Sequence, residues 1–146
     1  MFYVMYIYYK DPFDKLVRMI NNSKRELDVI KTNEQEILIS TDAYTLRITK
    51  GGNNVKFASE DYSTEFNYCF WFEIIPSYKQ WADDLIKFVD LILEHTKGDL
   101  VLESNGDKPI LLRKSNDLYI DRNIGDGSFP FNLLKMSFEE KVLQRE

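Results

Sequence analysis

The alternation of apolar and polar residues along the chain predicts a sheet made mainly of antiparallel strands. In the clearest segment, residues 65–75, every second residue from Phe66 to Ile74 is large and apolar. The residues between them are also largely apolar, which predicts a central strand with a helix on at least one side. Shorter alternating segments predict further strands at residues 2–9, 27–31, 36–40, 44–50, 100–104, 109–114 and 118–121.

Two longer segments show the spacing of helices instead. Residues 12–22 begin with a proline, which suits the first turn of a helix, and carry apolar residues on one face. Residues 77–97 repeat apolar residues every three or four positions, and a capping box that starts at Ser77 predicts where this helix begins. Trp81 and Phe88 lie on its apolar side, so we expect both in the layer between this helix and the sheet.

Small residues mark the tight turns between these segments. Asn105-Gly106 is a strong hairpin signal and joins the strands on either side of it. Gly51-Gly52 is a second hairpin signal, from which we expect residues 55–58 to pair back onto 44–50 as a strand. A capping box from Ser137 to Glu140 predicts a short terminal helix beginning at Phe138.

Together these elements predict an α+β fold, a mainly antiparallel meander sheet of about seven strands with two principal helices packed on it. The chain has 146 residues, 44% hydrophobic and 29% charged, which is ordinary usage for one globular domain. Linkers and repeats are absent from the sequence, so we assign a single domain of residues 1–146.

The first residues, the longest apolar stretch and the single cysteine indicate the cellular compartment. The first ten residues lack a basic segment and a cleavage site, and they resemble a strand more than a signal peptide. The longest apolar helical stretch, 85–93, is too short to cross a bilayer. One cysteine, Cys69, excludes an internal disulfide and suits a reducing compartment. We therefore expect a cytoplasmic protein with no membrane partner.

The formal net charge of −5 is unevenly distributed. Residues 59–107 hold 11 acidic and 3 basic side chains, whereas the segments before and after balance at +2 and +1. Phosphate backbones require clustered Lys and Arg, so direct binding of nucleic acid is not expected. An acidic middle suits a basic protein partner, because complementary fields speed encounter. The alternative is a solvated acidic face that only confers solubility.

The residues that usually carry catalysis are scarce. His95 is the only histidine, at the end of a helix where the macrodipole explains it, and Cys69 sits in a strand between aromatic residues. One His and one Cys do not make a zinc site, and the glycines lack the spacing of a phosphate-binding loop. We predict no cofactor, no metal and no enzymatic activity. The alternative is a small hydrolase or transferase that uses the carboxylates Asp83, Asp84 or Asp121.

Several segments resemble one known class of proteins. The order of features is an aromatic strand, a helix that contains Trp, a Gly-Asp pair before a strand, an Asn-Gly hairpin, and a strand that ends in Leu-x-Arg. These are Phe70–Ile74, Trp81–Leu85, Gly98-Asp99, Asn105-Gly106 and Leu111–Arg113. Over about a third of the chain, residues 70–121, this order resembles small immunity proteins of bacterial polymorphic-toxin and contact-dependent growth inhibition systems.

The resemblance implies a cytosolic antidote that binds a cognate toxin domain, often a nuclease, and blocks its active site. From the acidic middle we predict that Glu60, Asp61, Tyr62 and Glu65 contact a basic toxin. The chain also has more tyrosines than its core needs, and tyrosine suits interface anchors or half-buried strand positions. The tyrosines in question are Tyr3, Tyr6, Tyr8, Tyr9, Tyr62 and Tyr78.

Overall fold

The computed structural model describes residues 1–146 apart from 24–27, 125–128 and 146. Within these residues nine strands form one sheet, in the order β2-β3-β4-β5-β1-β6-β7-β8-β9. All neighbouring strands are antiparallel except β8 and β9, which are parallel. The strands are β1 (Phe2–Ile7), β2 (Asp28–Thr32), β3 (Glu36–Ser40), β4 (Tyr44–Lys50), β5 (Tyr68–Ile74), β6 (Leu100–Ser104), β7 (Lys108–Lys114), β8 (Asp117–Asp121) and β9 (Glu139–Lys141).

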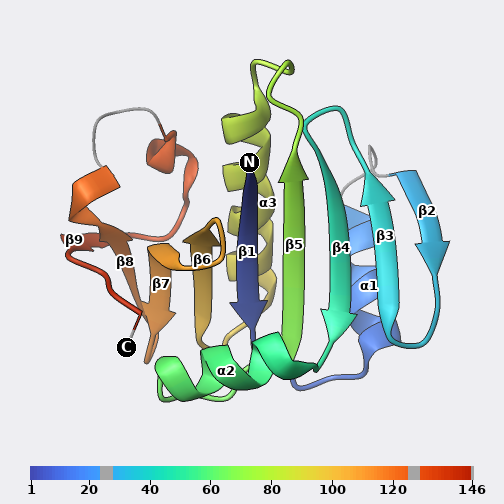
Figure 1. Ribbon diagram of the computed structural model, residues 1–146, viewed down its shortest axis with the longest axis horizontal. Coiled ribbons are helices and arrows are strands. Elements are labelled where there is room, and N and C mark those ends of the chain that lie inside the picture. Colours follow the sequence, from blue (N-terminus) through green and yellow to red (C-terminus); the bar gives the residue numbers. More distant parts are fainter. Residues whose placement is uncertain (24–27, 125–128, 146) are drawn as a thin grey trace.

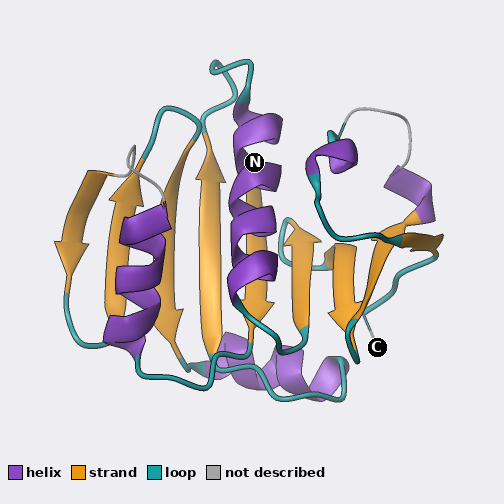
Figure 2. Ribbon diagram, turned by 180° about the vertical axis from the view of Figure 1, so that it is seen from behind, coloured by secondary structure: helices purple, strands orange, loops and turns teal. Residues whose placement is uncertain are grey.

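The helices cover the two faces of the sheet unequally. They are α1 (Phe13–Ser23), α2 (Asn53–Asp61) and α3 (Trp81–His95), with 3₁₀ turns η1 (Arg122–Ile124) and η2 (Phe131–Leu133). Figure 2 shows α1 and α3 on the same face of the sheet, which we call the helix face. On the other side, which we call the open face, α2 lies across the ends of the central strands (Figure 1). The α+β prediction is therefore confirmed.

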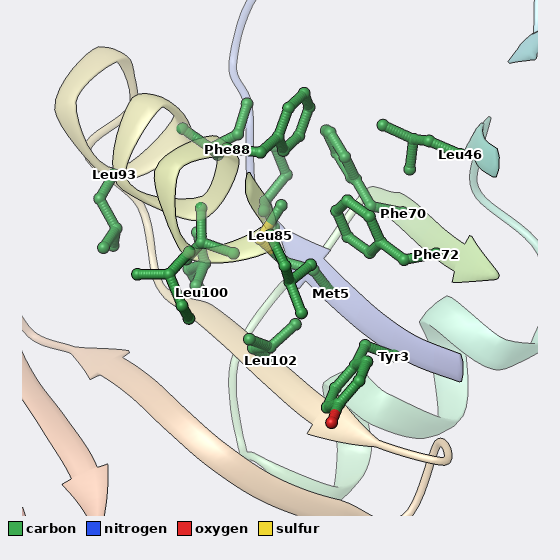
Figure 3. Packing of buried hydrophobic residues seen from close by; sticks show 14 of the residues in the cluster. Tyr3, Met5, Leu46, Phe70, Phe72, Leu85, Phe88, Leu93, Leu100 and Leu102 are labelled. Carbon is green, nitrogen blue, oxygen red and sulfur yellow. The ribbon is translucent and has the colours of Figure 1, made fainter. Parts of the chain in front are cut away.

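The helix face holds the main core. Alternate residues of the central strands point into it, because successive side chains of a strand point to opposite sides. Phe88 of α3 packs against Phe70 and Phe72 of β5, with ring centroids 6.1 and 5.6 Å apart (Figure 3). Trp81 is only partly buried, against Tyr3 and Phe129. Phe88 therefore lies in the packing layer as predicted, and Trp81 lies at its margin.

The central strand β1 separates β5 from β6, so the sheet is not a simple meander. Both neighbours are antiparallel to β1, and α3 connects them over the helix face (Figure 2). Asn105 and Gly106 have φ values of +54° and +80° in the turn that joins β6 to β7, so the predicted hairpin is confirmed.

The segment after Gly51-Gly52 was predicted wrongly. The glycines take φ values of +69° and +103°, but they lead into α2 and not into a strand that pairs back. Val55 and Ala58 are both buried against the open face, and they are three positions apart, which puts them on one side of a helix. The two glycines permit either outcome, and burial of these side chains selects the helix. Three α-helices therefore pack on the sheet in the described part of the chain, where two principal ones were predicted.

Two capping-box predictions also differ from the structure. Helix α3 begins at Trp81 with Gln80 as its N-cap, and Ser77 lies in the turns before it. The predicted terminal helix at Phe138 is instead strand β9, which pairs in parallel with β8. Burial of Leu143 and its backbone bond to Asp121 Oδ1, 2.9 Å, fix the extended course of the chain end. Local capping signals are worth about 1 kcal/mol, and contacts with distant residues override them here.

Candidate functional site

Beyond α2, the open face presents a row of side chains that no described helix covers. Leu38, Arg47 and Trp71 are cross-strand neighbours on β3, β4 and β5. The Trp71 ring stacks on Phe2 of β1, with centroids 4.5 Å apart and an interplanar angle of 9°. Arg47 is exposed and the other three are partly exposed. We call these four residues the floor.

Helix α2 borders the floor along one end of the sheet (Figure 1). Phe57 points outward and is 53% exposed, although it is a large apolar residue. Glu60, three positions later on the same side of the helix, is exposed, and so is Glu65 in the loop that follows. We call Phe57, Glu60 and Glu65 the ledge. Floor and ledge together form an aromatic surface with an acidic border.

The structure separates the four residues that were predicted to contact a partner. Glu60 and Glu65 are exposed, Asp61 is partly buried, and Tyr62 is only 8% exposed. Tyr62 lies under the ledge and not on it, so its side chain supports this surface and is not available to a partner. Of the six tyrosines considered as interface anchors, Tyr3 and Tyr6 are buried as well.

A buried polar network holds the end of α2 to the sheet. The Tyr62 hydroxyl donates to Oε2 of Glu103, a β6 carboxylate with 0% exposure. Nη1 of Arg145 donates to Glu103 Oε1 at 3.2 Å and to the Gly106 carbonyl at 2.9 Å. Nε of Arg145 donates to Asp61 Oδ2 at 2.6 Å. The network thus links α2, β6 and the chain end, and Arg145 compensates both carboxylates.

Burial dominates the electrostatics of this network. Desolvation raises the pKa of Glu103, and the bonds from Tyr62 and the charge of Arg145 only partly oppose it. Burial and the neighbouring Glu103 raise the pKa of Tyr62, which keeps its hydroxyl protonated as a donor. Burial also raises the pKa of Cys69 to about 12, so its thiol is protonated at neutral pH.

The backbone beyond α2 is fixed as well. Ser63 takes a left-handed conformation with φ of +52°, and the Thr64 N–H donates to the Ser59 carbonyl at 3.0 Å. This is the hydrogen-bond pattern of a Schellman motif. Nζ of Lys114 donates to the Tyr62 and Ser63 carbonyls at 2.7 and 3.1 Å. The ledge is therefore held in one geometry before any partner arrives.

The acidic middle of the sequence is partly neutralised by the basic residues that follow it. Asp61 pairs with Arg145 at 2.6 Å, Glu94 with Lys135 at 3.1 Å, and Asp99 with Lys114 at 3.5 Å; these three ion pairs draw on residues 108–146. Glu60 and Glu65 make no ion pair with any residue that the structure describes. The negative charge left for a partner is thus more localised than the sequence indicates.

The candidate catalytic groups do not converge. Asp83 and Asp84 lie in the first turn of α3, whereas Asp121 ends β8. Asp121 is 1% exposed and engaged by Lys108 Nζ, 3.1 Å, and by the backbone N–H described above. Among the described residues, no three or more His, Cys, Asp or Glu side chains are grouped so that they could hold a metal ion. Nor is any described helix long and apolar enough to cross a membrane.

The Gly-Asp and Leu-x-Arg segments meet at the end of α3. Arg113 donates to the carbonyls of Leu93 and Gly98 at 2.8 and 2.9 Å, and so holds the last turn of the helix. A Cβ on Gly98 would lie 2.9 Å from the Tyr8 Cβ and 3.0 Å from its carbonyl oxygen, so only glycine fits without displacement. These motif residues therefore stabilise the fold at the end of α3.

Sequence reasoning missed the floor and Phe57. The alternation in β5 placed Trp71 opposite the core residues, but its exposure depends on which face α2 covers. Phe57 was assigned to a strand, although its spacing from Glu60 fits the outer side of a helix. Arg145 gave no local signal, because its partners are 42 and 84 residues away.

The model of the SitI3-like family matches residues 1–127. The searches of curated proteins and of solved structures returned no match. The match covers well over half of the chain. It includes strands β1 to β8 in chain order and the described helices α1, α2 and α3. The protein therefore belongs to the SitI3-like family, whose name denotes immunity proteins of toxin systems.

Proposed function

We propose that this protein neutralises a cognate toxin domain by binding it with the open face and covering the toxin's active site. The observation that carries the proposal is the SitI3-like family match over residues 1–127, because that family name denotes immunity proteins. Neutralisation by occlusion requires a complementary surface and no chemistry of the antidote's own.

The composition of the floor supports the choice of this face. Tryptophan, tyrosine and arginine carry much of the binding energy in protein interfaces. The floor offers Trp71, with Arg47 and Phe2 on the strands to either side of it. Stacking on Phe2 holds the Trp71 ring in place, which lowers the entropy that binding must remove. Trp71 is the residue we assign as the central anchor.

The acidic side chains of the ledge favour a basic partner. Glu60 and Glu65 are exposed and unpaired among the described residues, so their charge is available to steer a positively charged surface. Nuclease domains are basic where they contact phosphate, so a nuclease is the toxin class that best suits this acidic border. Asp61 and Tyr62 act indirectly in this proposal, by holding α2 in place.

The experiment uses the product of the gene immediately upstream, where we expect the cognate toxin domain to be encoded. The double variant Glu60→Lys with Glu65→Lys should lower the association rate constant about tenfold and reduce its dependence on salt. Thermal melting should be unchanged, because both side chains are exposed. In a second arm, Trp71→Ala should raise Kd about 30-fold, mainly through faster dissociation.

The matched control reverses two exposed carboxylates elsewhere, Glu34→Lys with Asp117→Lys, which changes the net charge equally. This control should leave both rate constants within about twofold of the parent values. Equal slowing by both double variants would mean that only net charge matters and would exclude the ledge. If the unaltered protein does not bind the upstream toxin domain, the proposed function is wrong.

A further inference from the structure

A second candidate surface lies at the lower end of the helix face, away from the floor. A groove of about 520 Å³ runs between the end of β1, the start of α1 and the end of α3. It is lined chiefly by Tyr8, Tyr9, Lys10, Lys15, His95 and Lys97, and we call it the lysine groove. Its volume is that of a typical ligand site.

The sign of its charge is opposite to that of the whole chain. Three lysines and Asp11 give the lining a net charge of +2 with His95 neutral, whereas the protein carries −5. Lys15 pairs with Asp11 at 3.3 Å, but Lys10 and Lys97 are exposed and form no ion pair with any described residue. Two positive charges are therefore available to a ligand.

The walls of the groove are fixed in place. The Asn67 amide bonds both backbone groups of Tyr9, accepting from its N–H at 2.8 Å and donating to its carbonyl at 2.7 Å. The Tyr9 ring packs edge-on against Tyr68, 6.4 Å away, and Gly98 lies directly against Tyr8. A preformed groove costs little ordering entropy on binding.

The end of α3 does not oppose a negative ligand as a bare helix terminus would. Helix C-termini carry partial negative charge on their unpaired carbonyls. Here the Thr96 hydroxyl donates to the Ile92 carbonyl at 2.6 Å, and Arg113 donates to the Leu93 carbonyl at 2.8 Å. Arg113 is 4% exposed, so its charge lies behind the groove and adds to the positive potential.

We propose that the lysine groove binds an acidic, extended peptide segment of a partner protein. That the partner is a protein rests on the proposed function. The cations are spread along the groove on two chain segments, 10–15 and 95–97, which suits carboxylates spaced along a peptide. A nucleotide phosphate is usually cradled by a glycine-rich loop or held by an arginine fork, and none of the described residues that line the lysine groove is an arginine. Tyr8 and Tyr9 supply apolar and hydroxyl contacts to the same segment.

The test titrates the full-length protein with a fluorescently labelled oligoglutamate peptide and follows its anisotropy. We expect saturable binding that weakens with salt, and a loss of affinity of about tenfold in Lys10→Glu with Lys97→Glu. The matched control, Lys79→Glu with Lys87→Glu, makes the same change in net charge at exposed positions outside the groove. It should retain most of the affinity.

Three results would overturn the assignment. They are no binding of oligoglutamate, equal loss of affinity in both double variants, or tighter binding of tripolyphosphate than of oligoglutamate through Lys10 and Lys97. The titration contains no toxin. It therefore tests peptide binding by the lysine groove even if the upstream toxin domain proves not to be the partner. Conversely, the ledge variants Glu60→Lys and Glu65→Lys should leave peptide binding intact, which separates the two surfaces.

Discussion

The two faces of the sheet are built from the same strands but differ in what their side chains do. On the helix face, alternate residues of β1, β4 and β5 are buried under α1 and α3 in one continuous apolar cluster. On the open face, the cluster under α2 is small, it lies beside a charged network, and Trp71 and Arg47 remain accessible. The period of two in a strand allows this division, since one set of residues can stabilise the fold while the other set is free to bind.

From this difference we predict that replacing a phenylalanine by alanine lowers stability on the helix face and lowers toxin affinity on the open face. Phe88→Ala should lower the free energy of unfolding by about 3–5 kcal/mol, because it leaves a cavity between α3 and β5. Phe57→Ala should change it by less than about 0.5 kcal/mol and should weaken toxin binding instead. Urea denaturation measures both. A large loss of stability in Phe57→Ala would show that the ledge belongs to the core.

A smaller effect is expected from the polar network of the open face. Arg145→Ala leaves Glu103 and Asp61 without their cation, and we expect a loss of about 2–3 kcal/mol in the free energy of unfolding. Adding Glu103→Gln should recover part of that loss, because the uncompensated buried charge is then removed. A double-mutant cycle gives the coupling energy between the two side chains. Strict additivity would argue that Arg145 does not compensate Glu103.

The smallest predicted effect is on pH dependence. Burial raises the pKa of Glu103 above its ordinary value of 4.5, so the folded state binds this proton more tightly than the unfolded state does. Its contribution to stability is fully present below pH 4.5 and is lost as the pH rises through the higher folded-state pKa. Glu103→Gln cannot ionise, so its stability relative to the parent protein should improve with pH across that window. Urea unfolding at a series of pH values tests this, and a constant difference would contradict it.

Much of the fold was predictable because its signals are local and repeated. Strands β3, β4 and β6 have the predicted bounds, and α1, β1, β5, β7 and β8 differ from prediction by a few residues at their ends. Helix α2 was missed, because two glycines suit a hairpin as well as a helix start and the choice depends on where Val55 and Ala58 are buried. Strand β9 was missed because its partner is distant in sequence.

The candidate site was less predictable than the fold. The sequence located an acidic segment, and two of its four proposed contact residues, Glu60 and Glu65, are exposed. It could not reveal that Tyr62 and Glu103 bond to each other under α2, or that Arg145 pairs with Asp61. Charge in a sequence indicates only how many ionised groups exist, and folding decides which of them neutralise one another.

The sequence by itself determined the class of fold, the main core and the scarcity of catalytic groups, since these follow from periodicity and composition. Only the tertiary structure decided which face α2 covers, which carboxylates remain unpaired, and that lysines from two distant segments line one groove. The physical reason is that hydrophobic patterning acts along a strand or helix, whereas burial and ion pairing depend on distances between residues far apart in the chain.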